Sequence, residues 1–226
     1  MSRSYLSLSK DEKEHAMALH EESIVIDSSV VSVINYVAEN MWLEDMIKGG
    51  VTATNLTVGM QRRFVEALQE IIEHNHWAKR NSDRVISVRK AEDIERAKNE
   101  GKHGIIFGPQ DSMFIERDLD LLEIAYEHGL RAMQLTYNWQ NEIGSGCREE
   151  KDSGLSIFGE RVVEKMNELG ILIDLSHTGD QTCWDAIEQS KDPVSFTHII
   201  PRKSAPDNPG GYAEWANRST SLWGPL

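Results

Sequence analysis

The sequence predicts an α/β protein, a (β/α) barrel of the TIM type that is incomplete, with about six of the eight units of a closed barrel. Between residues 23 and 199, short apolar or β-branched runs alternate with amphipathic segments of helical period. Strands of this kind are typical of a parallel sheet covered by helices. Neither G-x-G-x-x-G after the first strand nor G-x-x-x-x-G-K-S/T anywhere is present, which favours a barrel over a nucleotide-binding doubly wound sheet.

The first half of the chain alternates between runs rich in β-branched residues and helical segments that end at glycine. The runs SIVIDSSVV and VTATNLTV are typical of strands. One helix stops at Gly49-Gly50, and a later, charged helix stops at Gly101. The expected strands are residues 23–31, 51–58 and, as a short extra strand, 85–88; the expected helices are residues 40–48, 62–79 and 91–100.

In the second half the alternation is sharper, with apolar runs such as GIIFG and ILIDL. After His198 the sequence is rich in Pro, Gly and Asn and offers no further convincing strand. We therefore expect a single domain over residues 1–226, with a polar N-terminal segment at 1–22 and an irregular tail at 200–226. The expected strands are residues 104–108, 131–137, 171–175 and 193–197, and the expected helices are 118–128, 156–169 and 180–189.

Composition excludes several classes of function. The 226 residues include 24 Lys and Arg against 37 Asp and Glu, a net charge of −13, which argues against binding to nucleic acid. No apolar run is long enough for a membrane span, and the polar N-terminus does not resemble a secretory signal. Two cysteines, Cys147 and Cys183, cannot form a disulfide framework. We therefore expect a cytoplasmic protein that binds neither nucleic acid nor membrane.

Two histidines occupy the position where active groups of parallel α/β proteins lie, the carboxyl end of a strand. His177 follows ILIDLS and His198 follows PVSFT, 21 residues later, which is one β/α repeat. Neighbouring strands lie about 4.8 Å apart, so the two imidazoles can share a metal ion. The alternative is that each is simply a hydrogen-bonded histidine at a strand end.

Other polar side chains also lie in or after expected strands. Asp27 lies in the first strand, Gln110 and Asp111 follow GIIFG, and Asn138 follows Tyr137. Residues of these types serve either as site residues or as turn and cap residues, and the pattern alone does not separate the two roles.

Three blocks of sequence extend this reading. They are HGLRAMQLTYN at 128–138, GLSIFGERVVEKMNELGILIDLSHTGDQT at 154–182 and DPVSFTHIIPR at 192–202. Through these blocks the chain resembles the renal (membrane) dipeptidase family, the zinc peptidases of type M19 in the amidohydrolase superfamily. The resemblance implies a (β/α)8 barrel with a two-zinc centre that hydrolyses dipeptides and related small amides.

The resemblance also implies roles for residues of this chain. His177 and His198 correspond to two histidines that hold one zinc, and Tyr137 stands where the family has a substrate-contacting histidine. The bridging glutamate corresponds to Gln110, and the first-strand H-x-D corresponds to Ser29 and Val31. The family's H-P-R-N stretch appears only as NPGG at 208–211, and the last two β/α units are absent, so the chain resembles a C-terminally truncated member.

These replacements remove the negative charge that holds two cations together, because a glutamine offers only a neutral carbonyl oxygen. We therefore expect at most one Zn²⁺ ion, or none, held by His177 and His198 with Gln110, Asp27 or water. Gln110 and Tyr137 would orient the carbonyl of a dipeptide or small amide, or stabilise the developing oxyanion.

Three other hypotheses stay open at this point. In the first, the chain is a catalytically impaired barrel that serves as a binding or assembly module. In the second, the remaining units come from a partner chain or a second copy. An open sheet leaves edge groups unpaired, so a homo-oligomer would cover the barrel edge. The weakest hypothesis is a cofactor-dependent lyase or isomerase, since fold does not fix function.

Overall fold

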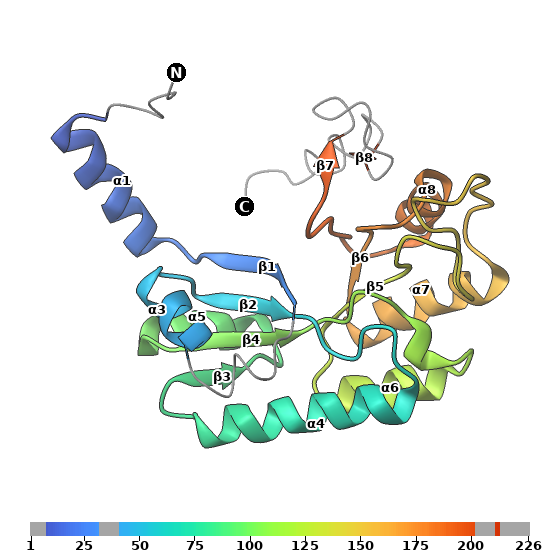
Figure 1. Cartoon of the computed structure of the whole chain (residues 1–226), viewed down its shortest axis with the longest axis horizontal. Coiled ribbons are helices and arrows are strands. Elements are labelled where there is room, and N and C mark those ends of the chain that lie inside the picture. Colours follow the sequence, from blue (N-terminus) through green and yellow to red (C-terminus); the bar gives the residue numbers. More distant parts are fainter. Residues whose placement is uncertain (1–7, 32–40, 202–210, 213–226) are drawn as a thin grey trace.

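The computed structural model of the protein describes residues 8–31, 41–201 and 211–212. Its strands are parallel, and helices lie outside them (Figure 1). Four strands form one sheet in the order β1-β2-β4-β3: β1 (Ile26–Val30), β2 (Ala53–Leu56), β3 (Val85–Ser87) and β4 (His103–Phe107). The predicted parallel α/β architecture is confirmed.

The wall continues through β5 (Ala132–Gln134) and β6 (Leu172–Asp174), which also pair in parallel. A parallel bridge between Phe107 and Leu130 joins β4 to the segment before β5, and another between Asp174 and Ser195 continues beyond β6. The order β1, β2, β4, β5, β6 and residue 195 is that of an incomplete barrel, and β3 is the short extra strand, paired with the beginning of β4.

The two ends of this incomplete wall approach each other. The Ser28 hydroxyl in β1 donates a hydrogen bond to the Thr197 carbonyl oxygen at 2.7 Å. This contact lies at the end of the wall where the chain passes from Thr197 to His198. The curvature of the sheet therefore brings the first strand close to the segment that carries the second histidine.

Two expectations about the C-terminal part need correction. The expected strand at 193–197 is reduced to one parallel bridge, between Ser195 and Asp174. Its neighbour β6 is three residues long and ends at Asp174, so the pairing goes no further. The tail is not wholly irregular, since β7 (Ile200–Pro201) and β8 (Gly211–Tyr212) form a short parallel pair. Two-residue strands carry no apolar periodicity from which a sequence could reveal them. Most of the tail, and with it most of the NPGG stretch, lies outside the described residues.

The helices begin and end close to where the sequence places them. Helix α7 begins after Ser156, whose hydroxyl accepts a hydrogen bond from the Gly159 N–H, and it ends at Gly170, which adopts a left-handed conformation with φ 72°. The sequence did not predict α1 or the 3-10 turn η1. The helices are α1 (Lys10–Glu22), α3 (Met41–Lys48), α4 (Phe64–Arg80), α5 (Ala91–Glu100), α6 (Leu119–Glu127), α7 (Ile157–Leu169) and α8 (Asp180–Gln189), with η1 at Met113–Ile115.

Helix α1 differs from the others because none of its residues is buried. It extends away from the strands (Figure 1). Its last turn is joined to the body by His20, whose Nε2 lies 2.9 Å from the Gly49 carbonyl oxygen. None of the described helices is long and apolar enough to cross a membrane.

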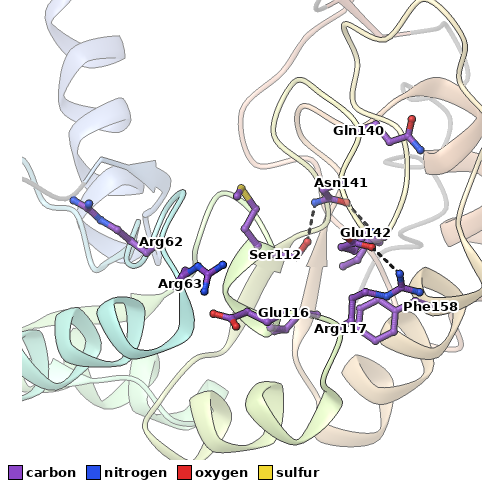
Figure 2. Close-up of a pocket in the computed structure, with 12 residues that line it drawn as sticks. Arg62, Arg63, Ser112, Glu116, Arg117, Gln140, Asn141, Glu142 and Phe158 are labelled. Atoms are coloured by element: carbon purple, nitrogen blue, oxygen red, sulfur yellow. Dashed lines mark hydrogen bonds and ion pairs between the residues drawn. The ribbon is translucent and has the colours of Figure 1, made fainter.

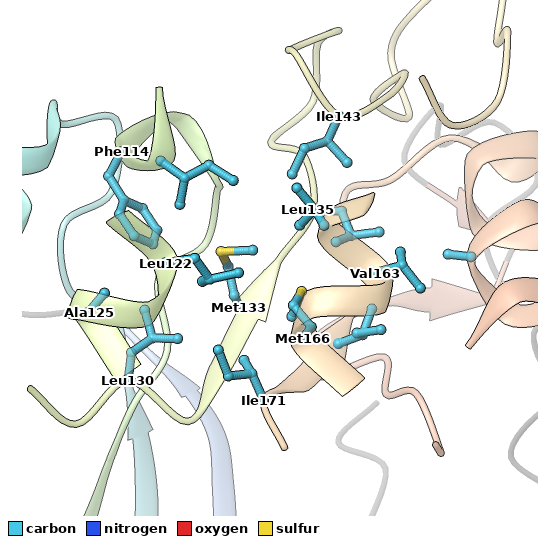
Figure 3. Packing of buried hydrophobic residues seen from close by; sticks show 14 of the residues in the cluster. Phe114, Leu122, Ala125, Leu130, Met133, Leu135, Ile143, Val163, Met166 and Ile171 are labelled. Atoms are coloured by element: carbon cyan, nitrogen blue, oxygen red, sulfur yellow. The ribbon is translucent and has the colours of Figure 1, made fainter. Parts of the chain in front are cut away.

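Two apolar clusters hold the helices against the strands. One packs α6 and α7 against β5 and β6, with Leu122, Met133, Val163 and Met166 all fully buried (Figure 3). The other lies between α3, α4 and the first sheet and includes Leu43, Leu56, Ile71, Trp77, Ile105 and Phe107. Burial of these side chains sets the strand positions and hence the positions of the strand ends.

Shortening a side chain in the first cluster tests this packing. Leu122 is fully buried, so Leu122→Ala should lower the free energy of unfolding by about 2–5 kcal/mol through lost burial and a residual cavity. Leu19→Ala on α1, where the side chain is 51% exposed, is the matched control and should change little. Urea unfolding of both variants measures the difference, and equal losses would contradict the assigned core.

Candidate metal and catalytic site

Three of the predicted site residues lie together at the carboxyl ends of the strands. The ring centroids of His177 and His198 are 4.9 Å apart, and those of Tyr137 and His177 are 4.4 Å apart with the rings stacked. His177 follows β6, His198 follows the bridge at Ser195, and Tyr137 follows β5. The structure therefore places the two histidine rings next to each other at this edge of the wall.

His177 is held by Asn138, and both residues adopt the left-handed conformation, with φ 58° and 64°. Residues other than glycine adopt this conformation at a cost, and such residues cluster at functional sites. His177 Nδ1 lies 2.8 Å from Asn138 Oδ1, an atom that only accepts hydrogen bonds. Nδ1 therefore carries the ring proton, and the lone pair of His177 is on Nε2.

The backbone around this pair is also fixed. The Cys147 N–H donates to the His177 carbonyl oxygen, and the Arg148 N–H donates to the Asn138 carbonyl oxygen, both at 2.8 Å. Gly146, just before these two residues, lies against the Asn138 backbone, and a Cβ there would come within 2.2 Å of the Asn138 carbonyl carbon. Only glycine allows this close approach of the two segments.

His198 is held by a chain of hydrogen bonds that ends at a buried carboxylate. Its Nδ1 lies 2.7 Å from the Thr197 hydroxyl oxygen, which donates its own proton to Asp174 Oδ2 at 2.6 Å. The Thr197 hydroxyl therefore accepts the proton of His198 Nδ1. His198 Nε2 is buried and has no hydrogen-bond partner.

The protonation of His177 agrees with this arrangement. Burial, together with the nearby charge of His198, lowers the pKa of His177 from 6.5 to about 4. His177 is therefore neutral at pH 7, as a metal-ligating imidazole must be.

The two histidines could supply two of the four ligands of the tetrahedral coordination that zinc prefers. In the part of the chain that the structure describes, no group of three or more His, Cys, Asp or Glu side chains could hold a metal ion.

Gln110 lies on the β1 and β2 side of the barrel mouth, buried among hydroxyl groups. Its side-chain NH₂ donates to Ser29 Oγ at 2.9 Å and to Thr57 Oγ1 at 3.0 Å. Both amide protons are engaged, so a substrate oxygen would compete with these hydroxyls for them. Gln110 is joined to β5 through its backbone carbonyl oxygen, which accepts a hydrogen bond from Gln134 Nε2 at 2.6 Å.

The contacts of Asp27 lie within β1 and toward β2. It lies in β1 opposite Thr54, and its carboxylate accepts a hydrogen bond from the Ser29 N–H at 3.2 Å. Its charge acts on His103, a buried histidine at the beginning of β4, by raising the pKa that burial lowers. The carboxylate whose charge acts on His177 is that of Asp174, not Asp27.

The sequence analysis missed Asp174 and Thr197. Both were visible as the Asp of D-L-S-H and the Thr of F-T-H, each next to a candidate histidine. Asp174 lies inside an apolar strand, and the sequence does not show which groups donate hydrogen bonds to its carboxylate. Those partners come from a segment 23 residues further along the chain.

A model of the membrane dipeptidase family, Peptidase family M19, matches residues 13–208. The chain belongs to this family. Over 109 residues, 46% of this chain, it is 33% identical to a protein of Schizosaccharomyces pombe described as an uncharacterized dipeptidase. An amidohydrolase from Pseudomonas aeruginosa is 38% identical, with a TM-score of 0.79 over 86% of this chain.

A more distant likeness shows the shared fold alone. A metallo peptidase from Rhodobacter sphaeroides is 18% identical, with a TM-score of 0.68 over 80% of this chain and 67% of its own. This chain of the dipeptidase family spans only part of the length of its relatives. It covers 26% of the S. pombe protein and 58% of the amidohydrolase.

The lowered pKa of His177 predicts a pH dependence of stability in the metal-free protein. Between about pH 6.5 and about pH 4 the unfolded state binds this proton and the native state does not, so the free energy of unfolding falls as the pH falls. The contribution is fully present above that range. His177→Gln should remove it, which urea unfolding at about pH 7 and about pH 5 measures. An equal pH dependence in the parent and the variant would contradict the assignment.

Proposed function

We propose that this family member is a metal-dependent hydrolase of a dipeptide or related small amide and that it uses one divalent ion, Zn²⁺, at His177 and His198. The observation that carries the proposal is the buried, unpartnered Nε2 of His198 beside the neutral ring of His177. A buried polar atom without a partner costs free energy, and a metal ion would satisfy it. Membership of a dipeptidase family supports the class of substrate.

The residues of the chain act on the geometry and protonation of this site. Asn138 and the Thr197–Asp174 pair hold the Nδ1 protons of the two histidines, which leaves Nε2 of each ring for an ion. Tyr137, stacked on His177, would orient the substrate carbonyl. The chemistry that a divalent ion supplies in such a site is a bound water of lowered pKa and a polarised carbonyl.

A second candidate function is a catalytically impaired barrel that binds a ligand or partner. The Ser29–Gln110–Thr57 hydrogen bonds favour it, because they form a network of neutral groups where the resemblance places metal ligands. The cytoplasmic location and the closure of the barrel edge by a second copy stay predictions.

The proposed function is tested by metal binding and hydrolysis in the same preparations. We expect the parent to bind one zinc ion per chain, and His177→Ala and His198→Ala each to reduce zinc affinity by at least about tenfold, since each removes one of two protein ligands. His15→Ala on the exposed helix α1 is the matched control and should bind as the parent does. Metal analysis after dialysis and hydrolysis of alanyl-alanine with zinc, manganese or cobalt provide the readouts.

The outcomes separate the two candidates. Stoichiometric zinc with hydrolysis that the histidine variants lose supports the hydrolase. No hydrolysis under any of the three metals rejects it and leaves the binding module. Zinc binding that is equal in the parent and in both histidine variants rejects the site itself.

Restoring the replaced ligands should rebuild a two-ion centre. Ser29 and Gln110 are in direct hydrogen-bond contact, and neighbouring Ser28 reaches the segment that leads to His198. Ser29→His, Val31→Asp and Gln110→Glu together should therefore raise the metal content from at most one ion per chain toward two, and raise dipeptide hydrolysis. Gln110→Asn, which adds no charge, is the control. Two tightly held ions in the parent would contradict the assigned losses.

A further inference from the structure

A cavity lies at the same end of the strands as the histidines. It opens between the loops that follow β2, β4 and β5, and its volume is about 470 Å³, in the range of small-molecule sites. Arg62 and Arg63 form one side, and Glu142, Arg117 and Phe158 lie on the other (Figure 2). This is the face on which barrels of this type carry ligand sites.

The inner wall of the cavity is apolar and rigid. Ile115 and Ile143 are each 1% exposed, and Phe158 is 7% exposed in the first turn of α7. Asn141 fixes the rim by donating to Ser112 Oγ at 2.9 Å and to the Leu135 carbonyl oxygen at 2.8 Å. Because these side chains are almost wholly covered, the apolar side chain that the cavity exposes most is that of Met113, at 54%.

The charges around the cavity leave two guanidinium groups without an anion. Arg117 pairs with Glu142 at 3.3 Å. Glu116 accepts a hydrogen bond at 3.1 Å from the backbone N–H at the start of α4. The ion pairs among the described residues include neither Arg62 nor Arg63, although the chain as a whole carries a net charge of −13. Arginine binds carboxylates through two parallel hydrogen bonds.

The backbone around the cavity is held in an unfavourable conformation. Among the described residues, five that are not glycine have positive φ angles. Two of them are Asn138 and His177, and the other three surround this cavity: Gln61 at 54°, Glu116 at 46° and Arg117 at 65°. Such residues gather at ligand sites, where the surrounding structure holds them in place.

Buried Asp111 supplies the constraint that holds these loops. Its carboxylate accepts hydrogen bonds from the backbone N–H groups of Gln61 and Met113, one in each of two loops that border the cavity. Asp111 is 1% exposed. The loop that presents Arg62 and Arg63 is thereby fixed relative to the apolar wall.

We propose that this cavity is a second ligand site, separate from the histidine pair, that binds a small carboxylate with an apolar substituent. The carboxylate lies against Arg63 and Arg62, and the substituent packs on Met113 and the edge of Phe158. The site does not depend on metal or on hydrolysis.

Calorimetry with N-acetyl-leucine as the probe tests this site. We expect a dissociation constant of about 1 mM or tighter in the parent, and a loss of at least about tenfold in the double variant Arg62→Gln, Arg63→Gln. Arg80→Gln, at the opposite exposed end of α4, is the matched control and should bind as the parent does. Both arginines are exposed, so unchanged thermal unfolding confirms that the double variant is folded.

Further arms identify the chemistry that is recognised. N-acetyl-leucinamide, which lacks the charge, and N-acetylglycine, which lacks the apolar group, should each bind at least about tenfold more weakly. The double variant His177→Ala, His198→Ala should bind N-acetyl-leucine as the parent does. Equal binding of the amide, inorganic phosphate binding as tightly as the probe, no binding by the parent, or loss of binding in the histidine variant would each overturn the proposal.

Discussion

The buried carboxylate of Asp174 is the interaction on which the histidine end of this barrel depends. It accepts hydrogen bonds from the Ser176 N–H, the Thr197 N–H and the Thr197 hydroxyl. A buried charge is tolerated only when its hydrogen bonds are satisfied, so the turn that leads to His177 and the segment that leads to His198 are held to one point. The tautomer of His198 follows from the same carboxylate through Thr197.

On the opposite side of the barrel mouth, neutral side chains stand where the family resemblance places charged metal ligands. Gln110, Ser29 and Thr57 satisfy one another with neutral hydrogen bonds. Such a network needs no cation to balance it, whereas a carboxylate at the same place would. The site is therefore asymmetric: two histidine rings lie next to each other on one side, and a network of neutral hydrogen bonds lies on the other.

Five described residues other than glycine adopt the left-handed conformation, and all of them lie at or next to the two proposed sites. They divide between the histidine pair and the arginine-lined cavity, and each group is held by a buried side chain or a close backbone contact. The segment from Asn138 to Ile143 passes from one site to the other. Strain of this kind needs a rigid surrounding structure, and the buried cluster around Met133 and Met166 provides it.

The sequence alone determined the parallel α/β class, the helix ends at glycine and the two histidines at strand ends, because periodicity, stop signals and strand-end position are local. Only the tertiary structure decided which carboxylate serves the histidines. Asp174 is linked to His198 through the Thr197 hydroxyl, which lies on the next segment of the wall. The arginine cavity also depends on tertiary structure, because its walls come from three separate loops that no local pattern joins.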